Sequence, residues 1–452
     1  MVATTELDLS RLRRAFHRYP EPAWREFHTT ARLREEVEAI GVDELAVGPE
    51  AYDPDDRMAA PDPDSEEVRR WMDRAVEQGA DEELVEKMAG GNTGLVAVLD
   101  RRGEESGADG ADAADAADGP HVGLRVDIDG LFIEESADEE HVPAREGFRS
   151  ETGETMHACG HDAHMTWGLA VLDAVKRSDF AGRFTVFFQP AEEVSGGGRP
   201  MAESEYAAGL DALFAVHVGL DHPTGEVVAG VEEILAMCHV DATFHGTSAH
   251  AGKAPNEGDN AMQALGTAIQ NAYGIPRHAD GMTRVNVGVA EAGTASNIIA
   301  EEATIHGEAR GETTELMEYM KEKLSRTLES AAEMHGCTAD VEVVSESPRV
   351  DSDPELAGLV ADVAAGVDGV ETVTERAAFG ASEDATFLMD RAHREGGRAT
   401  FLIVGTDHPT SHHTGTFDVD ERSLPMGAEV LTKAVLSAGE GGGASEGETG
   451  AR

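Results

Sequence analysis

Residues 184–193 read Phe-Thr-Val-Phe-Phe-Gln-Pro-Ala-Glu-Glu, and this stretch indicates the fold class. Its first five residues are β-branched or aromatic without polar alternation, which is typical of a strand buried on both faces. Pro190 ends the strand, because proline cannot continue a central strand. Two carboxylates, Glu192 and Glu193, follow at once. Open α/β sheets place their functional groups just beyond the carboxyl ends of strands, so we expect an α/β protein with its site there.

Two further strand-like runs end in the same way. Leu213–Val216 is a short apolar run that ends at His217. Thr400–Val404 is another, and His408, His412 and His413 follow it. We therefore expect these histidines to lie on the same rim of the sheet as the two glutamates.

Residues 156–165 concentrate side chains that bind metals. They read Met-His-Ala-Cys-Gly-His-Asp-Ala-His-Met, with three histidines, one aspartate and one of the chain's three cysteines. A single buried histidine is usually a structural residue, but five such side chains around one glycine indicate coordination. Thiolate, imidazole and carboxylate form a ligand set for zinc or manganese, whereas calcium and magnesium prefer oxygen alone.

The number of candidate ligands indicates two metal ions. Such sites hold their metals about 3.5–4 Å apart, lower the pKa of water towards ~7 and polarise a carbonyl, while a free carboxylate moves the proton. Consecutive side chains that leave a strand diverge, so one of Glu192 and Glu193 can bind metal while the other faces the water. The alternative, two solvated surface glutamates, is disfavoured by their position after Phe-Phe-Gln-Pro.

Several motifs occur together in one order and carry a family resemblance. They are Arg125–Leu131, Met156–Met165, Phe188–Glu193, His217-Val218, Gly246–Ala251, Ser296–Ile298 and His413–Phe417. Over nearly its whole length the chain resembles the dinuclear metalloamidohydrolases that include hippurate hydrolase and the plant auxin-conjugate hydrolases. Further features are similar to the A-type subgroup of p-aminobenzoyl-glutamate hydrolases: Gly90–Gly94, Arg284–Val289, Ser382–Thr386 and Phe417–Glu421.

The resemblance implies a role for each matching residue. The metal ligands for two divalent ions per chain, Mn²⁺ or Zn²⁺, would be Cys159, His161, Glu193, His217 and His413. His413 is preferred to His412 by counting back from Phe417. Glu192 would be the catalytic base, Asp129 would orient a metal ligand, and His250 would stabilise the oxyanion. Asn297 and Arg310 would bind the substrate carboxylate, with an ordinary salt bridge as the alternative for Arg310.

The implied function is hydrolysis of the amide bond of an N-acyl or aroyl amino acid, with p-aminobenzoyl-glutamate as the best candidate. One alternative is a generic aminoacylase or carboxypeptidase-like hydrolase of other N-acyl amino acids. The other is a non-catalytic partner subunit on the same fold. The resemblance implies a homodimer formed through an inserted domain, and a related B-type chain would be a further partner.

The chain's 452 residues suffice for two or more domains. Residues 231–345 show the order βαββαβ of a ferredoxin-like unit, which we expect to be an inserted lid or dimerisation domain. The catalytic domain, a doubly wound and mostly parallel sheet, would comprise residues 1–230 and 346–452. His250 would then act on a site built by the other domain, in its own or the neighbouring protomer. We also expect an acidic helical insertion at about 50–89 and a flexible loop at 101–120.

The net charge of −52 is extreme, with 88 acidic against 36 basic side chains, of which only six are lysines. Self-repulsion on this scale destabilises a compact state in dilute buffer and is screened at high salt. We therefore predict a protein of a high-salt cytoplasm. The charge excludes nucleic acids and anionic membranes as partners. The sequence shows no apolar run typical of a membrane span or signal peptide, and the few cysteines favour a reducing compartment.

Overall fold

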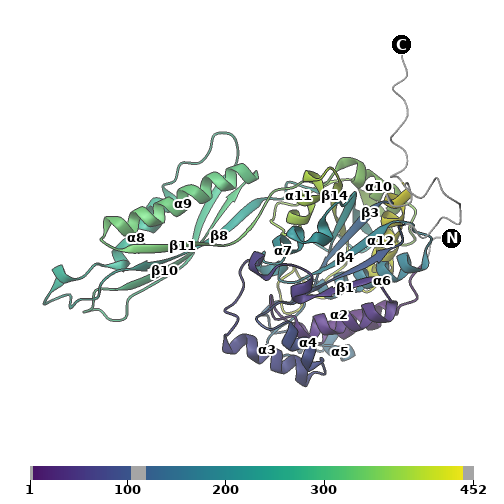
Figure 1. The fold of residues 1–452 in the computed structure, drawn as a ribbon, viewed down its shortest axis with the longest axis horizontal. Helices are drawn as coiled ribbons and strands as arrows, with labels where there is room; N and C mark the ends of the chain where they lie inside the picture. The colour runs from purple at the N-terminus through teal and green to yellow at the C-terminus, as the bar shows by residue number, and fades with distance from the viewer. Residues whose placement is uncertain (1–3, 103–118, 441–452) are drawn as a thin grey trace, which may run out of the picture. The chain divides into compact units, whose positions relative to one another are not determined.

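The computed structural model describes residues 4–102 and 119–440, which form two compact units (Figure 1). Unit 1 comprises Met1–Glu232, Val350–Phe379 and Ala385–Arg452, and unit 2 comprises Glu233–Arg349 and Gly380–Asp384. Most of the loop predicted at 101–120, namely residues 103–118, lies outside the described residues.

Unit 1 is built on an eight-stranded sheet in the order β1-β2-β4-β3-β5-β14-β6-β12. The four central strands β4, β3, β5 and β14 run parallel to one another, and β2 and β6 flank them antiparallel. The bounds are β1 Glu44–Val47, β2 Leu95–Asp100, β3 His121–Asp127, β4 Arg183–Gln189, β5 Ala212–Val218, β6 Glu226–Val228, β12 Thr372–Thr374 and β14 Arg398–Val404. The predicted α/β class with a mostly parallel sheet is confirmed.

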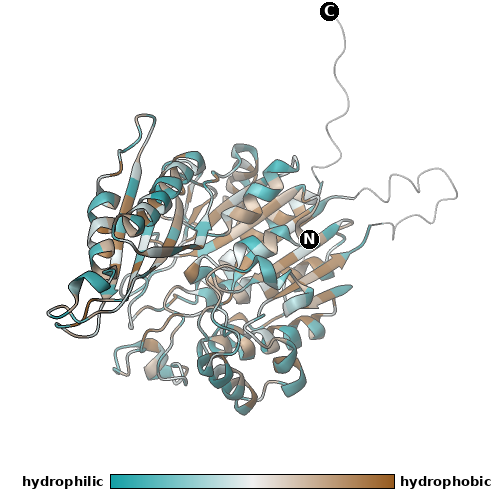
Figure 2. Cartoon of the chain, turned by 60° about the vertical axis from the view of Figure 1, so that its left-hand side comes forward, coloured by the Kyte–Doolittle hydropathy of each residue, from teal (hydrophilic) through white to brown (hydrophobic). Residues whose placement is uncertain are grey.

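Helices cover both faces of this sheet (Figure 1). One layer contains α1 (Leu9–His17), α2 (Phe27–Ile40), α6 (His161–Arg177), α10 (Pro354–Ala364) and α12 (Ser423–Glu440), which contact one another around α6 and α12. On the other face, α7 (Gly198–Glu203) packs against α11 (Thr386–Arg394). The central strands are mostly hydrophobic whereas the outer helices are largely hydrophilic (Figure 2), because strands covered on both faces have no solvent-facing side.

The acidic stretch at 50–89 contains two helices, α3 (Glu66–Glu77) and α4 (Glu82–Lys87). The side chains of Ser65 and Asp81 cap their first turns, as expected of N-cap residues. Val68, Trp71 and Ala75 of α3 are fully buried and belong to the core of unit 1. A short helix, α5 (Val142–Glu146), follows β3. Across the described part of the chain, every helix is too short or too polar to cross a bilayer.

Unit 2 has the predicted order βαββαβ. Its elements are β8 (Ala236–His245), α8 (Ala261–Tyr273), β9 (Thr283–Ala292), β10 (Glu302–Gly311), α9 (Thr314–Met334) and β11 (Thr338–Ser347). The strands form an antiparallel sheet in the order β11-β8-β10-β9. Helices α8 and α9 pack on it over a separate core that includes Cys238 and Cys337. The ferredoxin-like part of the fold prediction is therefore confirmed.

Candidate metal centre

The parallel strands of unit 1 bring ligand-type side chains to one edge of the sheet. Strand β3 ends at Asp127, and Asp129 follows two residues later. Beyond the end of β4, Glu192 and Glu193 lie in the short 3-10 helix η4 (Glu192–Val194). His217 lies inside β5, which corrects the expectation that the strand stops before it: parallel pairing with β14 continues to Val218.

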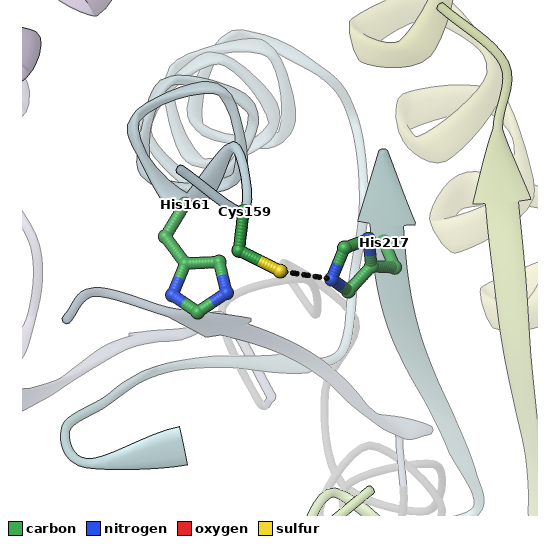
Figure 3. A group of neighbouring side chains, drawn as sticks. All are labelled: Cys159, His161 and His217. Carbon is green, nitrogen blue, oxygen red and sulfur yellow. Dashed lines mark hydrogen bonds between the residues drawn. The ribbon is translucent and has the colours of Figure 1, made fainter. Parts of the chain in front are cut away.

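Cys159 and His161 lie at the start of α6, on either side of Gly160. Gly160 has a φ of +86°, and a Cβ there would lie 2.3 Å from the side chain of Val218, so the turn needs glycine. The side chains of Cys159 and His161 lie near that of His217 in strand β5 (Figure 3). The Sγ atom of Cys159 is 3.4 Å from Nε2 of His217. One ligand atom from each of these three residues lies within 4.8 Å of the other two.

Cys159 also belongs to a second group, with Glu193 and His413, in which the ligand atoms again lie within 4.8 Å of one another. Nε2 of His413 is 3.4 Å from Oε2 of Glu193, and Nε2 of His161 is 3.8 Å from Oε1 of Glu193. The neighbouring His412 instead directs its Nε2 to the carbonyl oxygen of Val218, at 3.2 Å. The five residues predicted as ligands thus lie in two groups that share Cys159.

Two buried aspartates, one at the end of β3 and one just beyond it, contact this cluster. Oδ2 of Asp129 accepts a hydrogen bond from the backbone N–H of Glu193 at 3.0 Å, and its Oδ1 lies 3.3 Å from Nδ1 of His161. The carboxylate of Asp127 contacts Arg125 at 2.8 Å and Nδ1 of His164 at 2.5 Å. Because Asp129 contacts both a backbone amide of η4 and an imidazole of α6, it can orient both.

His164, which the sequence leaves between a ligand and a structural residue, is held at both ring nitrogens. Its Nδ1 faces Asp127, and its Nε2 accepts a hydrogen bond from the backbone N–H of Val218 at 2.8 Å. A ring nitrogen that accepts a hydrogen bond has its lone pair occupied. His164 therefore links β3 to β5 as a structural residue.

The residues present fit divalent metal ions. Nε2 of His161 and Oε1 of Glu193 are buried without a hydrogen-bond partner, and such buried polar atoms are costly unless something binds them. Burial lowers the pKa of His161, but Asp127, Asp129 and Glu193 outweigh it and raise the pKa to about 10. Burial also holds the pKa of His217 well below its ordinary value, which keeps that imidazole in its metal-binding form. The acidic side chains around His161 thus favour a positive charge in the pocket, and His217 offers a neutral nitrogen ligand beside it.

Glu192 lies next to the ligand groups. Its side chain is 12% exposed, and its Oε2 is 3.9 Å from Nε2 of His161. Glu192 also forms a compact group of possible ligand atoms with His161 and Glu193. A carboxylate in this position is within reach of a water held at the cluster, as a general base must be.

The other predicted residues lie in unit 2. His250 and Asn297 are both exposed and stand on neighbouring loops, joined by a 3.0 Å hydrogen bond from the N–H of Ala251 to the carbonyl of Asn297. Arg310 lies on β10 with its guanidinium 3.1 Å from the carboxylate of Glu308, two residues earlier on the same strand. The structure therefore brings His250 and Asn297 together, whereas Arg310 makes the ion pair named as its alternative.

Two buried glutamates near the cluster went unnoticed in the sequence. Glu21 accepts hydrogen bonds from the backbone N–H groups of His28 and Thr29 at the start of α2, and burial raises its pKa to about 8. Glu26 accepts one from the backbone N–H of Ala191. The local sequence gives no signal for them, because the segment 20–27 also contains Arg25 and has the pattern of an ordinary charged stretch.

A second buried network surrounds His17. Nδ1 of His17 is 2.8 Å from Asp162, and its Nε2 is 3.0 Å from Glu135. Since both neighbours are acceptors, the ring must donate from both nitrogens and carry a charge. Burial lowers the pKa of His17, but the hydrogen bonds to Asp162 and Glu135 outweigh it and raise the pKa to about 9.

This network predicts a loss of stability at alkaline pH. The folded pKa of His17 exceeds its unfolded value of about 6.5, so its stabilisation is complete below pH ~6.5 and is lost as the pH rises through about 9. The free energy of unfolding should fall by up to about 3 kcal/mol over this interval. Urea unfolding at several pH values would measure it, with His17→Asn as the control in which the slope should be smaller. An equal slope in that variant would contradict the prediction.

Comparisons with known proteins show what this chain is similar to. The model of "Peptidase family M20/M25/M40" matches residues 123–437. The chain is 35% identical over 432 residues to the A-type chain of p-aminobenzoyl-glutamate hydrolase from Escherichia coli, covering 95% of both chains. It is also 35% identical over 433 residues to indole-3-acetyl-aspartic acid hydrolase of Enterobacter agglomerans, again covering 95% of both.

A crystal structure provides the same evidence in three dimensions. The aminobenzoyl-glutamate utilization protein of Klebsiella pneumoniae superposes with a TM-score of 0.79 at 30% identity, covering 95% of both chains. The family match spans more than half of the chain, and the sequence relatives cover almost all of it. The chain therefore belongs to peptidase family M20/M25/M40, whose members are metal-dependent hydrolases of amide bonds.

Proposed function

We propose that this protein hydrolyses the amide bond between an aromatic acyl group and an acidic amino acid, with p-aminobenzoyl-glutamate as the leading substrate. The main observation is that five ligand-type side chains from four separate segments of the chain converge beside Glu192. The choice of substrate rests on two relatives of equal identity, which are named as hydrolases of p-aminobenzoyl-glutamate and of indole-3-acetyl-aspartate. Both compounds join an aromatic acyl group to an acidic amino acid.

Two divalent ions, Mn²⁺ or Zn²⁺, would be held by the two groups that share Cys159. The residues are Cys159, His161, Glu193, His217 and His413. Bound there, the ions would polarise the scissile carbonyl and lower the pKa of water. The thiolate favours zinc, whereas carboxylate and imidazole also suit manganese.

Glu192 would act as the general base and then as the general acid. It takes a proton from the attacking water and delivers it to the amine nitrogen as the C–N bond breaks, so the carboxylate ends unchanged. Asp129 positions the cluster through the backbone of Glu193 and the ring of His161. Stabilisation of the oxyanion by His250, and recognition of the substrate carboxylate by Asn297 and Arg310, stay predictions.

A substrate panel tests this proposal. The purified chain, loaded with Mn²⁺ or Zn²⁺, would be assayed with p-aminobenzoyl-glutamate, indole-3-acetyl-aspartate, hippurate and N-acetyl amino acids. The proposal expects the highest kcat/KM on the first two. A preference for N-acetyl amino acids would favour the generic aminoacylase, and inertness with metals present would favour a non-catalytic partner subunit.

We also propose that two copies associate through unit 2. Among the described residues, six of the seven exposed large hydrophobic side chains lie there: Met262, Tyr273, Val289, Ile298, Met334 and Val343. Exposed large apolar side chains can contribute to an interaction surface, and among the described residues unit 2 carries most of them. A related B-type chain is the alternative occupant, since the name of the Escherichia coli relative marks it as one component of a larger enzyme. Light scattering of the purified chain would distinguish the two.

Salt adaptation gives a further prediction. With a net charge of −52, the melting temperature should rise steeply from low to molar KCl, because the Debye length shrinks to ~3 Å at 1 M and repulsion is screened. A thermal melt followed by circular dichroism at increasing KCl concentrations would measure the shift. Undiminished stability without salt would contradict it.

A further inference from the structure

Glu26 is a carboxylate with no solvent exposure, at the N-cap of α2. Both of its oxygens accept hydrogen bonds. Oε1 accepts from the backbone N–H of Ala191 at 2.8 Å, and Oε2 accepts from the hydroxyl of Thr93 at 2.5 Å. Burying a carboxyl group is costly unless hydrogen bonds compensate, and these two contacts offset part of that cost for Glu26.

The turn that Glu26 contacts is strained. Ala191 and Ser195 bracket Glu192–Val194, and both adopt left-handed backbone conformations, with φ of +55° and +52°. Such a conformation is unfavourable for a residue other than glycine and persists only where the surroundings enforce it. The hydrogen bond from Ala191 to Glu26 is therefore one of the contacts that hold the turn in this shape.

A second carboxylate holds the same turn from another direction. The backbone N–H of Glu193 donates to Asp129 at 3.0 Å, so Ala191 and Glu193 are each held by a buried acid from a different segment. Both acids approach backbone amides, not the side chains of Glu192 and Glu193. Those side chains stay directed at the cluster, where Glu192 and Glu193 lie 3.9 and 3.8 Å from Nε2 of His161.

Glu26 is itself anchored. The hydroxyl of Tyr52 donates a hydrogen bond of 2.7 Å to the backbone carbonyl oxygen of Thr93, the partner of Glu26. The next residue, Gly94, donates its N–H to the hydroxyl of Thr30 on α2 at 2.9 Å. A continuous set of hydrogen bonds therefore runs from α2 and the segment before β2 through Glu26 to the turn.

We propose that Glu26 is a positioning residue that sets the geometry of Glu192 and Glu193 by holding the N–H of Ala191. This inference rests on the function proposed above for those two glutamates. Glu26 itself takes no part in the reaction. Its removal should change the conformation of the turn, and the rate should fall only as a consequence of that change.

Two substitutions at Glu26 separate its hydrogen bond from its bulk. Glu26→Leu fills a similar volume but removes both acceptors, whereas Glu26→Gln keeps an acceptor oxygen for Ala191. Thr93→Val removes one donor to Glu26 and serves as a milder variant should Glu26→Leu fail to fold. Glu21→Leu is the matched control, because Glu21 is an equally buried acid in the same segment that caps α2 instead of the turn.

The experiment measures kcat, KM and hydrogen–deuterium exchange of the peptide that spans residues 184–197, with and without metal. Glu26→Leu should lower kcat on the order of 100-fold, the effect of a misplaced catalytic group, with KM nearly unchanged. Exchange at Ala191–Ser195 should accelerate even in the metal-free protein. Glu26→Gln should restore most of the parental kcat and most of the parental exchange rate. Thr93→Val should change these two quantities in the same direction as Glu26→Leu, but by less.

Two results would overturn the proposal. One is parental exchange at Ala191–Ser195 in Glu26→Leu. The other is equally accelerated exchange there in Glu21→Leu, which would make the effect of Glu26 one of general stability. Glu21→Leu should instead lower the melting temperature while kcat stays at the parental value. Absence of amide hydrolysis by the parent protein would refute the proposed function alone, because the exchange measurement needs no substrate.

Discussion

Replacing Glu192 by alanine should abolish most hydrolysis while leaving both metal ions in place. A general base contributes roughly 10²–10⁴-fold to the rate, so kcat should fall by about that factor with little change in KM. The variant removes the proposed proton acceptor but none of the five proposed ligands, which come from other positions of the cluster. Steady-state kinetics and metal analysis of the same preparation would measure both effects.

The matched control is Glu193→Ala, one residue further along the same turn. Glu193 faces both His161 and His413, so its removal should reduce the metal content as well as the rate. Near-parental turnover in Glu192→Ala would exclude Glu192 as the base. Equal metal loss in the two variants would instead make Glu192 a ligand.

Cys159→Ser should have the largest effect on metal binding. Cys159 belongs to both ligand groups, and serine replaces a thiolate with a hydroxyl that stays protonated and binds zinc-type ions poorly. The metal content should fall from two ions per chain to one or fewer, and hydrolysis should fall with it. Mass-spectrometric metal analysis after dialysis would measure the change.

Cys337→Ser is the control for that experiment. Cys337 is also a buried free cysteine, but it lies in the core of unit 2, so its replacement should affect stability and leave two ions bound. Two ions retained in Cys159→Ser would remove that residue from the ligand set.

The central strands could be predicted from the sequence because the run Phe184–Phe188 consists of β-branched and aromatic residues without polar alternation, and complete burial leaves that pattern. The residue at which β5 ends could not be predicted in this way. Val218 becomes part of the strand by pairing with Val404, far along the chain, and a local pattern carries no information about that partner.

The same distinction applies to the site. Candidate ligands stand out because cysteine and histidine are concentrated in residues 156–165, and because glutamate and histidine follow strand-like apolar runs. Glu26 does not stand out, because its partners Ala191 and Thr93 are 165 and 67 residues away. His164 belongs to the conspicuous cluster, yet only its contacts with Asp127 and Val218 reveal a structural role. The chemistry of a residue is local, whereas its partners depend on the whole fold.

The position of β14 between β5 and β6 has a consequence for biosynthesis. Strand β5 is complete at Val218, but its neighbour β14 begins only at Arg398, and chains emerge from the ribosome at about 5–20 residues per second. During that delay the edge of β5 offers unpaired backbone groups, the kind of edge that promotes aggregation. Nascent chains, and fragments that terminate before β14, should therefore depend on chaperones until translation passes the last strand.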